Sequence, residues 1–287
     1  MSDRKIPLIG GHVSVAGGLF KAIENAEQIG ANCIQIFGAS PRQWQTRLPS
    51  DEEIKKYRER LRDSEVKKVY LHAAYLVNFA SSDEGLRKKS IKSLIDHLKI
   101  ASIIDSQGLI FHIGSGKELP KEKALAKVVE AIRLVLKSAP GADLIIENTA
   151  GGGQKIGSNA EEIGRVIKEV SSPRLKVCFD TAHAYEAGII DGYTKDNIKK
   201  LLNEWNEKVG LDKIIALHVN DSKTKFNSHH DRHENIGEGY IGLEGFKNLA
   251  KEKRLYDKAW ILEVPGFDGN GPDKKNIDIL RNCFSVK

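Results

Sequence analysis

The chain has 287 residues, of which 40% are hydrophobic and 29% charged, a balance typical of globular proteins and not of disordered ones. No apolar stretch is long enough for a bilayer, and the N-terminal "MSDRKIPLIG" lacks the apolar core of a signal peptide, so we expect a cytoplasmic protein without membrane contact. The net charge of +6 permits a polyanionic partner such as DNA without requiring one.

Eight short apolar segments recur along the chain, and amphipathic, charge-rich segments separate them. In chain order the apolar segments are "PLIGGHVSV" (7–15), "CIQIFGAS" (33–40), "KVYLHAAY" (68–75), "GLIFHIGS" (108–115), "DLIIENTA" (143–150), "KVCFDTAH" (176–183), "IIALHVND" (214–221) and "AWILEVPG" (259–266). Between them, segments such as "SDEEIKKYRERLRDSE" (50–65) carry apolar residues at helical spacing. Ser50 with Glu53, and Ser158 with Glu161, fit the capping-box pattern that begins a helix.

This alternation of strands and helices predicts an α/β protein whose parallel sheet is buried on both faces. Eight such units are the content of a (β/α)8 (TIM) barrel. An open doubly wound sheet is the alternative, but no GxGxxG follows the first strand. No linker rich in Pro, Gly or Ser divides the chain, so we predict a single domain over residues 1–287.

Six of the apolar segments end on a residue able to bind a metal ion. These residues are His72, His112, Glu147, Asp180, His218 and Glu263. In a parallel barrel the carboxyl ends of all strands open on one face, so residues far apart in sequence should converge there. One polar residue at a strand end is more often a hydrogen-bonded or capping group than a ligand, but six in the same register indicate a shared site.

A cluster of histidines and carboxylates at one mouth predicts bound divalent metal, because the same groups buried without a cation would repel each other. The spacing Asp180-x-x-His183 adds a histidine, and Asp231-x-His233 in "HHDRHENIGEG" adds two further candidates. Imidazole and carboxylate ligands suit zinc or a similar ion such as manganese. Nine candidates exceed the needs of one ion and predict two or three metals.

The chain resembles endonuclease IV, a family of metal-dependent apurinic/apyrimidinic (AP) endonucleases of DNA base-excision repair. The motifs that carry the resemblance are "GGHVSVAGGL" (10–19), "SPRQW" (40–44), "HAAYLVNFAS" (72–81), "FHIGS" (111–115), "IENTAGGG" (146–153), "CFDTAHAYEAG" (178–188), "LHVNDSK" (217–223), "DRHENIGEGYIG" (231–242) and "ILEVPG" (261–266). Their order along nearly the whole chain makes the resemblance specific.

The resemblance implies a barrel with three metal ions, usually zinc, at the C-terminal mouth. The residues that match the family's ligands are His72 and His112 for the first metal, Glu147 as the catalytic bridge to the second, Asp180, His218 and Glu263 for the second, and His183, Asp231 and His233 for the third. All nine positions carry the expected residue type. Manganese is possible at one or more of these sites.

The reaction implied by the resemblance is hydrolysis of the phosphodiester bond 5′ to an abasic site in duplex DNA, by a hydroxide that the metals activate. The products would be a 3′-hydroxyl and a 5′-deoxyribose phosphate. The residues that match the family's DNA contacts are Arg42, Gln43, Tyr75, Leu76 and Arg232. The resemblance implies no organic cofactor, and we expect a monomer.

Two positions depart from the family pattern. Ala182 stands where cysteine is frequent, and Asn227 stands where glycine is more usual, so Asn227 could change the backbone of the loop that carries Asp231 and His233. We expect His12 to orient a ligand from outside the ligand set and His229 with His230 to face solvent.

Two other functions compete with this interpretation. A metal-dependent sugar isomerase or epimerase on the same barrel would explain Glu147, Asp180, His218 and Glu263. It would leave His72, His112, the pair Asp231 and His233 in "DRH", and "SPRQW" without a role. In a non-catalytic DNA-binding or metal-storage barrel, the nine converging ligands would have no role.

Overall fold

The computed structural model describes residues 6–39, 43–44, 46–117 and 119–285. Eight parallel strands close into a barrel in the order β1-β10-β7-β6-β5-β4-β3-β2. These strands are β1 (Leu8–His12), β2 (Cys33–Phe37), β3 (Lys68–His72), β4 (Gly108–Phe111), β5 (Asp143–Glu147), β6 (Leu175–Asp180), β7 (Ile214–His218) and β10 (Ala259–Leu262). They are the eight apolar segments of the sequence, so the predicted (β/α)8 fold is confirmed.

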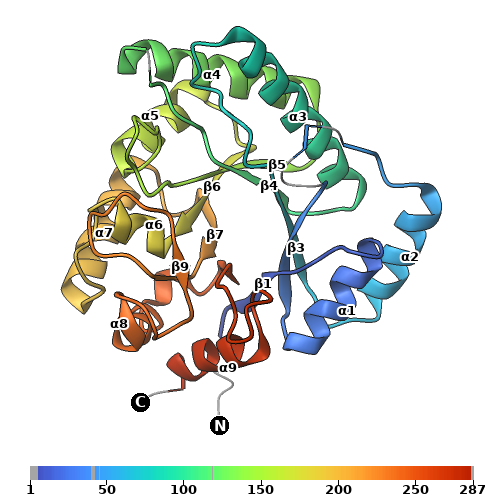
Figure 1. Ribbon diagram of the computed structural model, residues 1–287, viewed down its shortest axis with the longest axis vertical. Coiled ribbons are helices and arrows are strands. Elements are labelled where there is room, and N and C mark those ends of the chain that lie inside the picture. The colour runs from blue at the N-terminus through green and yellow to red at the C-terminus, as the bar shows by residue number, and fades with distance from the viewer. Residues whose placement is uncertain (1–5, 40–42, 45, 118, 286–287) are drawn as a thin grey trace.

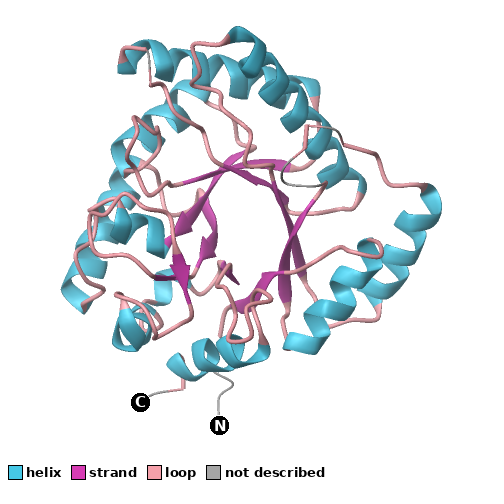
Figure 2. Ribbon diagram, in the orientation of Figure 1, coloured by secondary structure: helices cyan, strands magenta, loops and turns pink. Residues whose placement is uncertain are grey.

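Helices surround the ring of strands (Figure 2). They are α1 (Leu19–Ile29), α2 (Asp51–Arg62), α3 (Glu84–Ile103), α4 (Lys121–Ser138), α5 (Ala160–Val170), α7 (Lys195–Lys208), α8 (Gly242–Leu249) and α9 (Lys274–Cys283). The described residues also form four smaller elements: helix α6 (Thr181–Glu186), the 3-10 turn η1 (Lys253–Leu255), and the short antiparallel strands β8 (Asp221–Ser222) and β9 (His233–Glu234). Figure 1 shows α6 and β9 on the same side of the barrel.

The side chains of the strands fill two cores. Inside the barrel lie Cys33, Tyr70, Ile110, Ile145, Cys178, Ala216, Ala259 and Ile261. Residues of opposite orientation, such as Ile34 and Leu109, pack against the helices in a larger cluster. Gly10 lies so close to β2 that an added Cβ would be 1.6 Å from the carbonyl oxygen of Cys33, so only glycine fits there.

One of the two predicted capping boxes is present. Ser50 caps α2, and its hydroxyl accepts from the backbone N–H of Glu53 while the Glu53 carboxylate accepts from Ser50. The prediction for Ser158 and Glu161 was wrong, because Asn159 is the N-cap of α5 and accepts from the N–H of Glu162. Asparagine caps helices as well as serine does, so the helix begins one residue later.

Among the described residues, no helix is both long enough and apolar enough to cross a membrane.

Candidate metal centre

The barrel strands deliver six of the predicted ligands to one rim. Four of these residues are the last of their strands: His72 of β3, Glu147 of β5, Asp180 of β6 and His218 of β7. His112 and Glu263 follow β4 and β10 by one residue. The four that end strands are buried, with at most 3% of their surface exposed, whereas His112 and Glu263 face the opening.

Helix α6 begins directly at the end of β6. Asp180 is its N-cap, and a carboxylate oxygen accepts from the backbone N–H of His183 at 2.7 Å. The side chain of His183 is therefore held one turn beyond Asp180, buried at the same mouth. The same aspartate thus starts the helix and belongs to the candidate ligand set.

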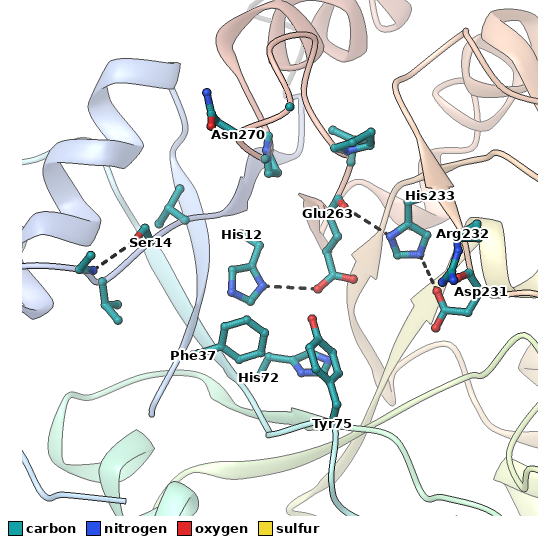
Figure 3. A pocket seen from close by; sticks show the side chains of 18 of the residues that line it. His12, Ser14, Phe37, His72, Tyr75, Asp231, Arg232, His233, Glu263 and Asn270 are labelled. Atoms are coloured by element: carbon teal, nitrogen blue, oxygen red, sulfur yellow. Dashed lines mark hydrogen bonds and ion pairs between the residues drawn. The ribbon is translucent and has the colours of Figure 1, made fainter. Parts of the chain in front are cut away.

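The remaining two predicted ligands are Asp231, near the end of the loop between β8 and β9, and His233, the first residue of β9. Oδ1 of Asp231 lies 3.3 Å from Nε2 of His183 and 3.7 Å from Nε2 of His233. Figure 3 shows Asp231 and His233 on one wall of the pocket, facing Glu263 and His12. Asp231 is nearly half exposed, so this end of the site is the more open one.

All nine predicted ligands fall into groups whose ligand atoms lie within 4.8 Å of one another. Four groups occur in the described residues: His72, His112 and Glu147; Glu147, Asp180, His218 and Glu263; Asp180, His183 and His233; and His183, Glu186 and Asp231. The first two match the sets expected for the first and second metals. The other two divide the set expected for the third metal, and they add Asp180 and Glu186 to it.

Glu147 has the geometry of a bridge between two of these groups. Its Oε2 lies 3.1 Å from Nε2 of His72 and 3.4 Å from Nε2 of His112. Its Oε1 lies 2.9 Å from Nδ1 of His218. The two oxygens of one buried carboxylate therefore face two different groups of histidines.

Hydrogen bonds on the outer side of the imidazoles fix which nitrogen faces the site. Nδ1 of His72 donates to the Ala73 carbonyl at 2.8 Å, and Nδ1 of His183 donates to the Asn148 carbonyl at 2.9 Å. Nε2 of His218 donates to Oε1 of Gln35 at 2.7 Å. In each case the other nitrogen is left to point inward, as in metal-binding histidines.

Two buried imidazole nitrogens at the mouth lack a hydrogen-bond partner in the part of the chain that the structure describes and are therefore available to bind a metal ion. They are Nε2 of His183 and Nε2 of His233. A buried polar atom without a partner costs roughly 1–3 kcal/mol unless something binds it. Imidazole nitrogens and carboxylates in this arrangement are the donor set that zinc prefers.

In the absence of metal, protons on some of the histidines compensate the negative charges of the neighbouring carboxylates. Burial opposes protonation of His183, but Asp180 and Asp231 outweigh it and hold the pKa of His183 well above its usual range. Burial also opposes ionisation of Glu147, yet His112 and His218 hold the pKa of that carboxyl well below its usual range. Burial lowers the pKa of His112 to about 4. Metal ions bound here would replace these shared protons.

Sequence reasoning did not identify three buried amides that position the ligands. Nδ2 of Asn220 donates to Oδ2 of Asp180 at 2.7 Å, and Oδ1 of Asn148 accepts from the Asp180 N–H at 2.7 Å. Nε2 of Gln35 donates to Oε1 of Glu263. A polar residue inside each of the apolar segments "CIQIF", "IENT" and "HVND" was the available signal.

His12 lies beside this network, as predicted. Its Nδ1 is 2.9 Å from Nε2 of Gln35 and 3.5 Å from Oε1 of Glu263. It is absent from the groups of ligand atoms, so its contacts are with a candidate ligand and with the amide that holds that ligand.

A pocket of about 970 Å³ opens above the candidate ligands. Its lining includes His12, Phe37, Tyr75 and Arg232. The ring of Tyr75 stands over the rim, 6.1 Å from the ring of His72, and its side chain is 65% exposed. The mouth therefore presents an aromatic ring to solvent directly beside the buried ligands (Figure 3).

The other predicted DNA contacts differ in their positions. Leu76 is exposed next to Tyr75, and Gln43 is exposed on the loop after β2. Arg232 is exposed, and its Nη1 donates to the carbonyl of Asp231 at 3.0 Å. Arg42 lies outside the described residues.

Asn227 keeps the backbone conformation that glycine would adopt. Its φ of 60° lies in the left-handed region, which asparagine tolerates better than most residues. The departure from glycine therefore does not disturb the loop at this position. His229 and His230 are exposed, as predicted, although the N–H of His229 donates to the carbonyl of Glu186.

Comparison with known proteins decides the family. The family described as Xylose isomerase-like TIM barrel matches residues 23–283. A protein of Halothermothrix orenii named "Probable endonuclease 4" is 38% identical over 275 residues, which cover 95% of this chain and 99% of that protein. The crystal structure of endonuclease IV from Thermus thermophilus is 33% identical and superimposes with a TM-score of 0.84, covering 97% of this chain and 99% of the other.

The chain belongs to the endonuclease IV family. It is accordingly an endonuclease, a hydrolase of phosphodiester bonds. A D-tagatose 3-epimerase-like protein also superimposes, with a TM-score of 0.70 at 20% identity, 96% of this chain and 97% of the other. That likeness extends to the fold alone.

Proposed function

We propose that this protein incises duplex DNA on the 5′ side of abasic sites and leaves a 3′-hydroxyl and a 5′-deoxyribose phosphate. The observation that carries the proposal is the convergence of nine histidines and carboxylates at one mouth, in groups of which two match the ligand sets expected for the first and second metals. The name and full-length similarity of the relatives support a substrate that is DNA.

Three zinc ions fit the residues of the mouth. His72, His112 and Glu147 would hold the first, and Glu147, Asp180, His218 and Glu263 the second. His183, Asp231 and His233 would hold the third. Bound zinc supplies Lewis acidity, which lowers the pKa of water and offsets the charge that develops on a phosphate during hydrolysis.

The chain's own residues perform the remaining tasks. Glu147 presents one oxygen to each of two histidine groups and so fixes their separation. Gln35 and Asn220 hold Glu263 and Asp180 in place, so that the ligands need no rearrangement when a phosphate arrives.

Recognition of the abasic site would depend on the rim. An abasic nucleotide leaves the base stack at little cost, which favours its entry into the pocket over that of an intact nucleotide. Tyr75 and Leu76 are exposed beside the pocket and would cover the neighbouring bases. Gln43, Arg42 and Arg232 would contact the backbone or the gap. We further propose that residues 1–287 act as one domain and as a monomer.

The proposal is tested with a duplex that carries one tetrahydrofuran analogue of the abasic site. This analogue resists lyase chemistry but not hydrolysis. We expect incision 5′ to the analogue by the zinc-loaded protein, no incision of the intact duplex, and loss of activity when chelators remove the metal. Absence of incision by fully metallated protein would refute the proposal, and turnover of a free ketose by a protein with one ion per chain would favour the isomerase.

A further inference from the structure

The loop from Lys223 to Arg232 hydrogen-bonds to helix α6 and, through Nδ1 of His229, to the carbonyl of Ala150 in the segment after β5. The N–H of Asn227 donates to the carbonyl of Tyr185 at 3.2 Å, and the N–H of His229 donates to the carbonyl of Glu186 at 2.9 Å. Both acceptors are the last residues of α6, the helix that carries His183. His233 is also held by its pairing with Ser222 and by a hydrogen bond from its Nδ1 to the carbonyl of Glu263, whereas the position of Asp231 relative to His183 depends on how this loop is seated on α6.

The side chain of Glu186 forms the centre of this attachment. It is fully buried, and its Oε1 accepts from three donors of the loop and its base: Oγ of Ser222 at 2.7 Å, Oγ1 of Thr224 at 3.2 Å and the N–H of Arg232 at 3.2 Å. Ser222 and Thr224 lie at the beginning of the loop, and Arg232 lies at its end. One carboxylate oxygen therefore joins both ends of the loop to the helix.

The bond to Arg232 has a direct relation to the candidate ligands. Arg232 lies between Asp231 and His233 in the chain, so the peptide that Glu186 holds is the one that separates these two side chains. His183 and Glu186 are three residues apart on α6 and share one face of the helix. The helix thus presents one ligand and, one turn later, the residue that positions the other two.

The second oxygen of Glu186 has no such partner. Oε2 is buried and makes no hydrogen bond among the described residues. A carboxylate oxygen of Glu186 also lies within 4.8 Å of ligand atoms of both His183 and Asp231. A buried carboxylate oxygen without a hydrogen-bond partner costs free energy, so an apolar side chain would fill this space at a lower cost.

We propose that Glu186 is a positioning residue for the third metal, which seats the loop bearing Asp231 and His233 on the helix bearing His183. This inference rests on the proposed function in one respect, namely that these three side chains bind a metal ion. Through its hydrogen bonds to Ser222, Thr224 and Arg232, Glu186 determines whether the three ligands meet. It does not itself touch the substrate.

Zinc content and zinc release test this role without measuring catalysis. The protein is loaded with zinc, freed of excess metal and titrated with a chromogenic chelator that reports each ion as it is lost. For Glu186→Ala we expect one ion per chain to be lost about 10–100-fold more readily than in the unchanged protein, the range found when a partner of a ligand is removed. The other ions should be released as before.

The conservative variant separates positioning from direct binding. Glutamine at this position keeps an oxygen that can accept from the same three donors, so Glu186→Gln should restore zinc retention to nearly that of the unchanged protein. If Glu186→Gln loses the ion as easily as Glu186→Ala does, the positioning role is wrong and the charge of Oε2 binds the metal. Unchanged zinc release in Glu186→Ala would also overturn the proposal.

Glu162 offers a matched control on α5. It is a buried carboxylate whose Oε2 accepts from the N–H groups of Gly157 and Ser158, and it belongs to none of the groups of candidate ligands. Glu162→Ala should lower the unfolding temperature while zinc release stays unchanged. Equal zinc loss in both alanine variants would show that general destabilisation explains the result and would overturn the proposal.

A second variant keeps the test usable if Glu186→Ala does not fold. The double variant Ser222→Ala with Thr224→Val removes two of the three donors and leaves the carboxylate in place. It should also weaken retention of one ion, and normal retention would count against the proposal. Failure of the proposed function is recognised separately, because the unchanged protein would then fail to retain zinc or to incise the abasic duplex.

Discussion

The two ends of the candidate metal centre are built in different ways. At the closed end, His72, Glu147 and His218 are the last residues of barrel strands and are buried. At the open end, Asp231 and His233 come from a loop and a two-residue strand, and Asp231 is nearly half exposed. The first set is held by the ladder of the barrel itself, whereas the second depends on contacts to a helix of six residues.

At the closed end the fold itself fixes the positions of the ligands, whereas at the open end hydrogen bonds of individual side chains must fix them. The backbone of a ligand at the end of a buried strand is fixed as long as the barrel stays closed. A ligand on a loop can move when one hydrogen bond is lost, because loops open locally at a lower free energy than a core does. We therefore expect substitutions at the two ends to have different consequences, and the following experiments measure that difference.

The largest effect is expected at the closed end, for Glu147→Gln. The amide keeps the size of the side chain but removes the charge that both histidine groups face. Cleavage of the abasic duplex should fall by more than about 100-fold, the upper end of the cost of losing a partner of a ligand. Binding of the same duplex, followed by fluorescence anisotropy, should persist.

Glu162→Gln on α5 serves as the control for this substitution, since Glu162 is also buried and lies outside the candidate site. It should cleave at the normal rate. A normal rate for Glu147→Gln itself would mean that the carboxylate does not bridge the two groups.

A smaller loss is expected for Gln35→Leu. This change removes the acceptor of His218 and the donor to Glu263 without touching the open end. Zinc affinity and cleavage should each fall about 10–100-fold. Competition with a chelator measures the first and the abasic duplex the second. Gln28→Leu on the surface of α1 is the control, and equal behaviour of the two variants would contradict a role for Gln35.

The acid–base behaviour of the metal-free protein gives a third test. The pKa values of His183 and His218 are raised, so their contribution to stability is complete below the ordinary value of 6.5 and is lost as pH rises. The pKa values of Glu147 and Glu263 are lowered, so their contribution is complete above the ordinary value of 4.5 and is lost as pH falls. The pKa of His112 is lowered to about 4, so its contribution to stability is complete above pH 6.5 and is lost as pH falls from 6.5 toward 4.

The unfolding temperature of the metal-free protein should therefore be highest near pH 6.5, at the upper end of the range between about pH 4.5 and 6.5. Zinc should stabilise more strongly as pH rises from about 5 to about 8, because fewer protons then compete for the ligands. Calorimetry with chelator and with zinc measures both profiles. A zinc effect that is the same at all pH values would show that the ligands do not exchange protons for metal.

The smallest effect is expected at Asn227, in the loop of the open end. Because asparagine already adopts the left-handed backbone, Asn227→Gly should change the free energy of unfolding by less than about 1 kcal/mol. Asn227→Val, whose branched side chain resists that conformation, should cost about 1–2 kcal/mol and weaken zinc retention. Urea unfolding compares the two, and equal stability would show that this backbone is not constrained.

Much of this arrangement could be predicted from the sequence. Each barrel strand is an apolar run, and most of these runs end on a polar residue. A residue such as Glu147 therefore indicates both where a strand ends and where the candidate site lies. Asp180 and His183 could be predicted together because a strand end and one helical turn fix their spacing. The prediction of the barrel was confirmed, and the site predictions depend on residues that are close in sequence and on a fold that aligns strand ends.

Other features depend on packing between distant segments. The contact of Gln35 with His218 and Glu263 joins three strands, and no local pattern indicates which way the amide points. Nothing in the segment "HAYEAG" distinguishes Glu186 from an ordinary helix residue. Its hydrogen bonds to the loop become apparent only in the folded structure. The start of α5 was missed for a different reason: Ser158 and Asn159 are both good caps, and the inward position of Glu162 favours the second.

The three free cysteines have a practical consequence. Cys33 and Cys178 lie inside the barrel and Cys283 on the inner side of α9, and burial raises the pKa of the first two thiols to about 12 and of the third to about 11. Almost no thiolate is present at neutral pH, and none of the three sulfurs is open to reagents. Alkylation of the native protein must wait for the chain to open. Cys33 and Cys178 would react when the barrel opens and Cys283 when α9 detaches, so labelling resolved by residue would time these two events separately.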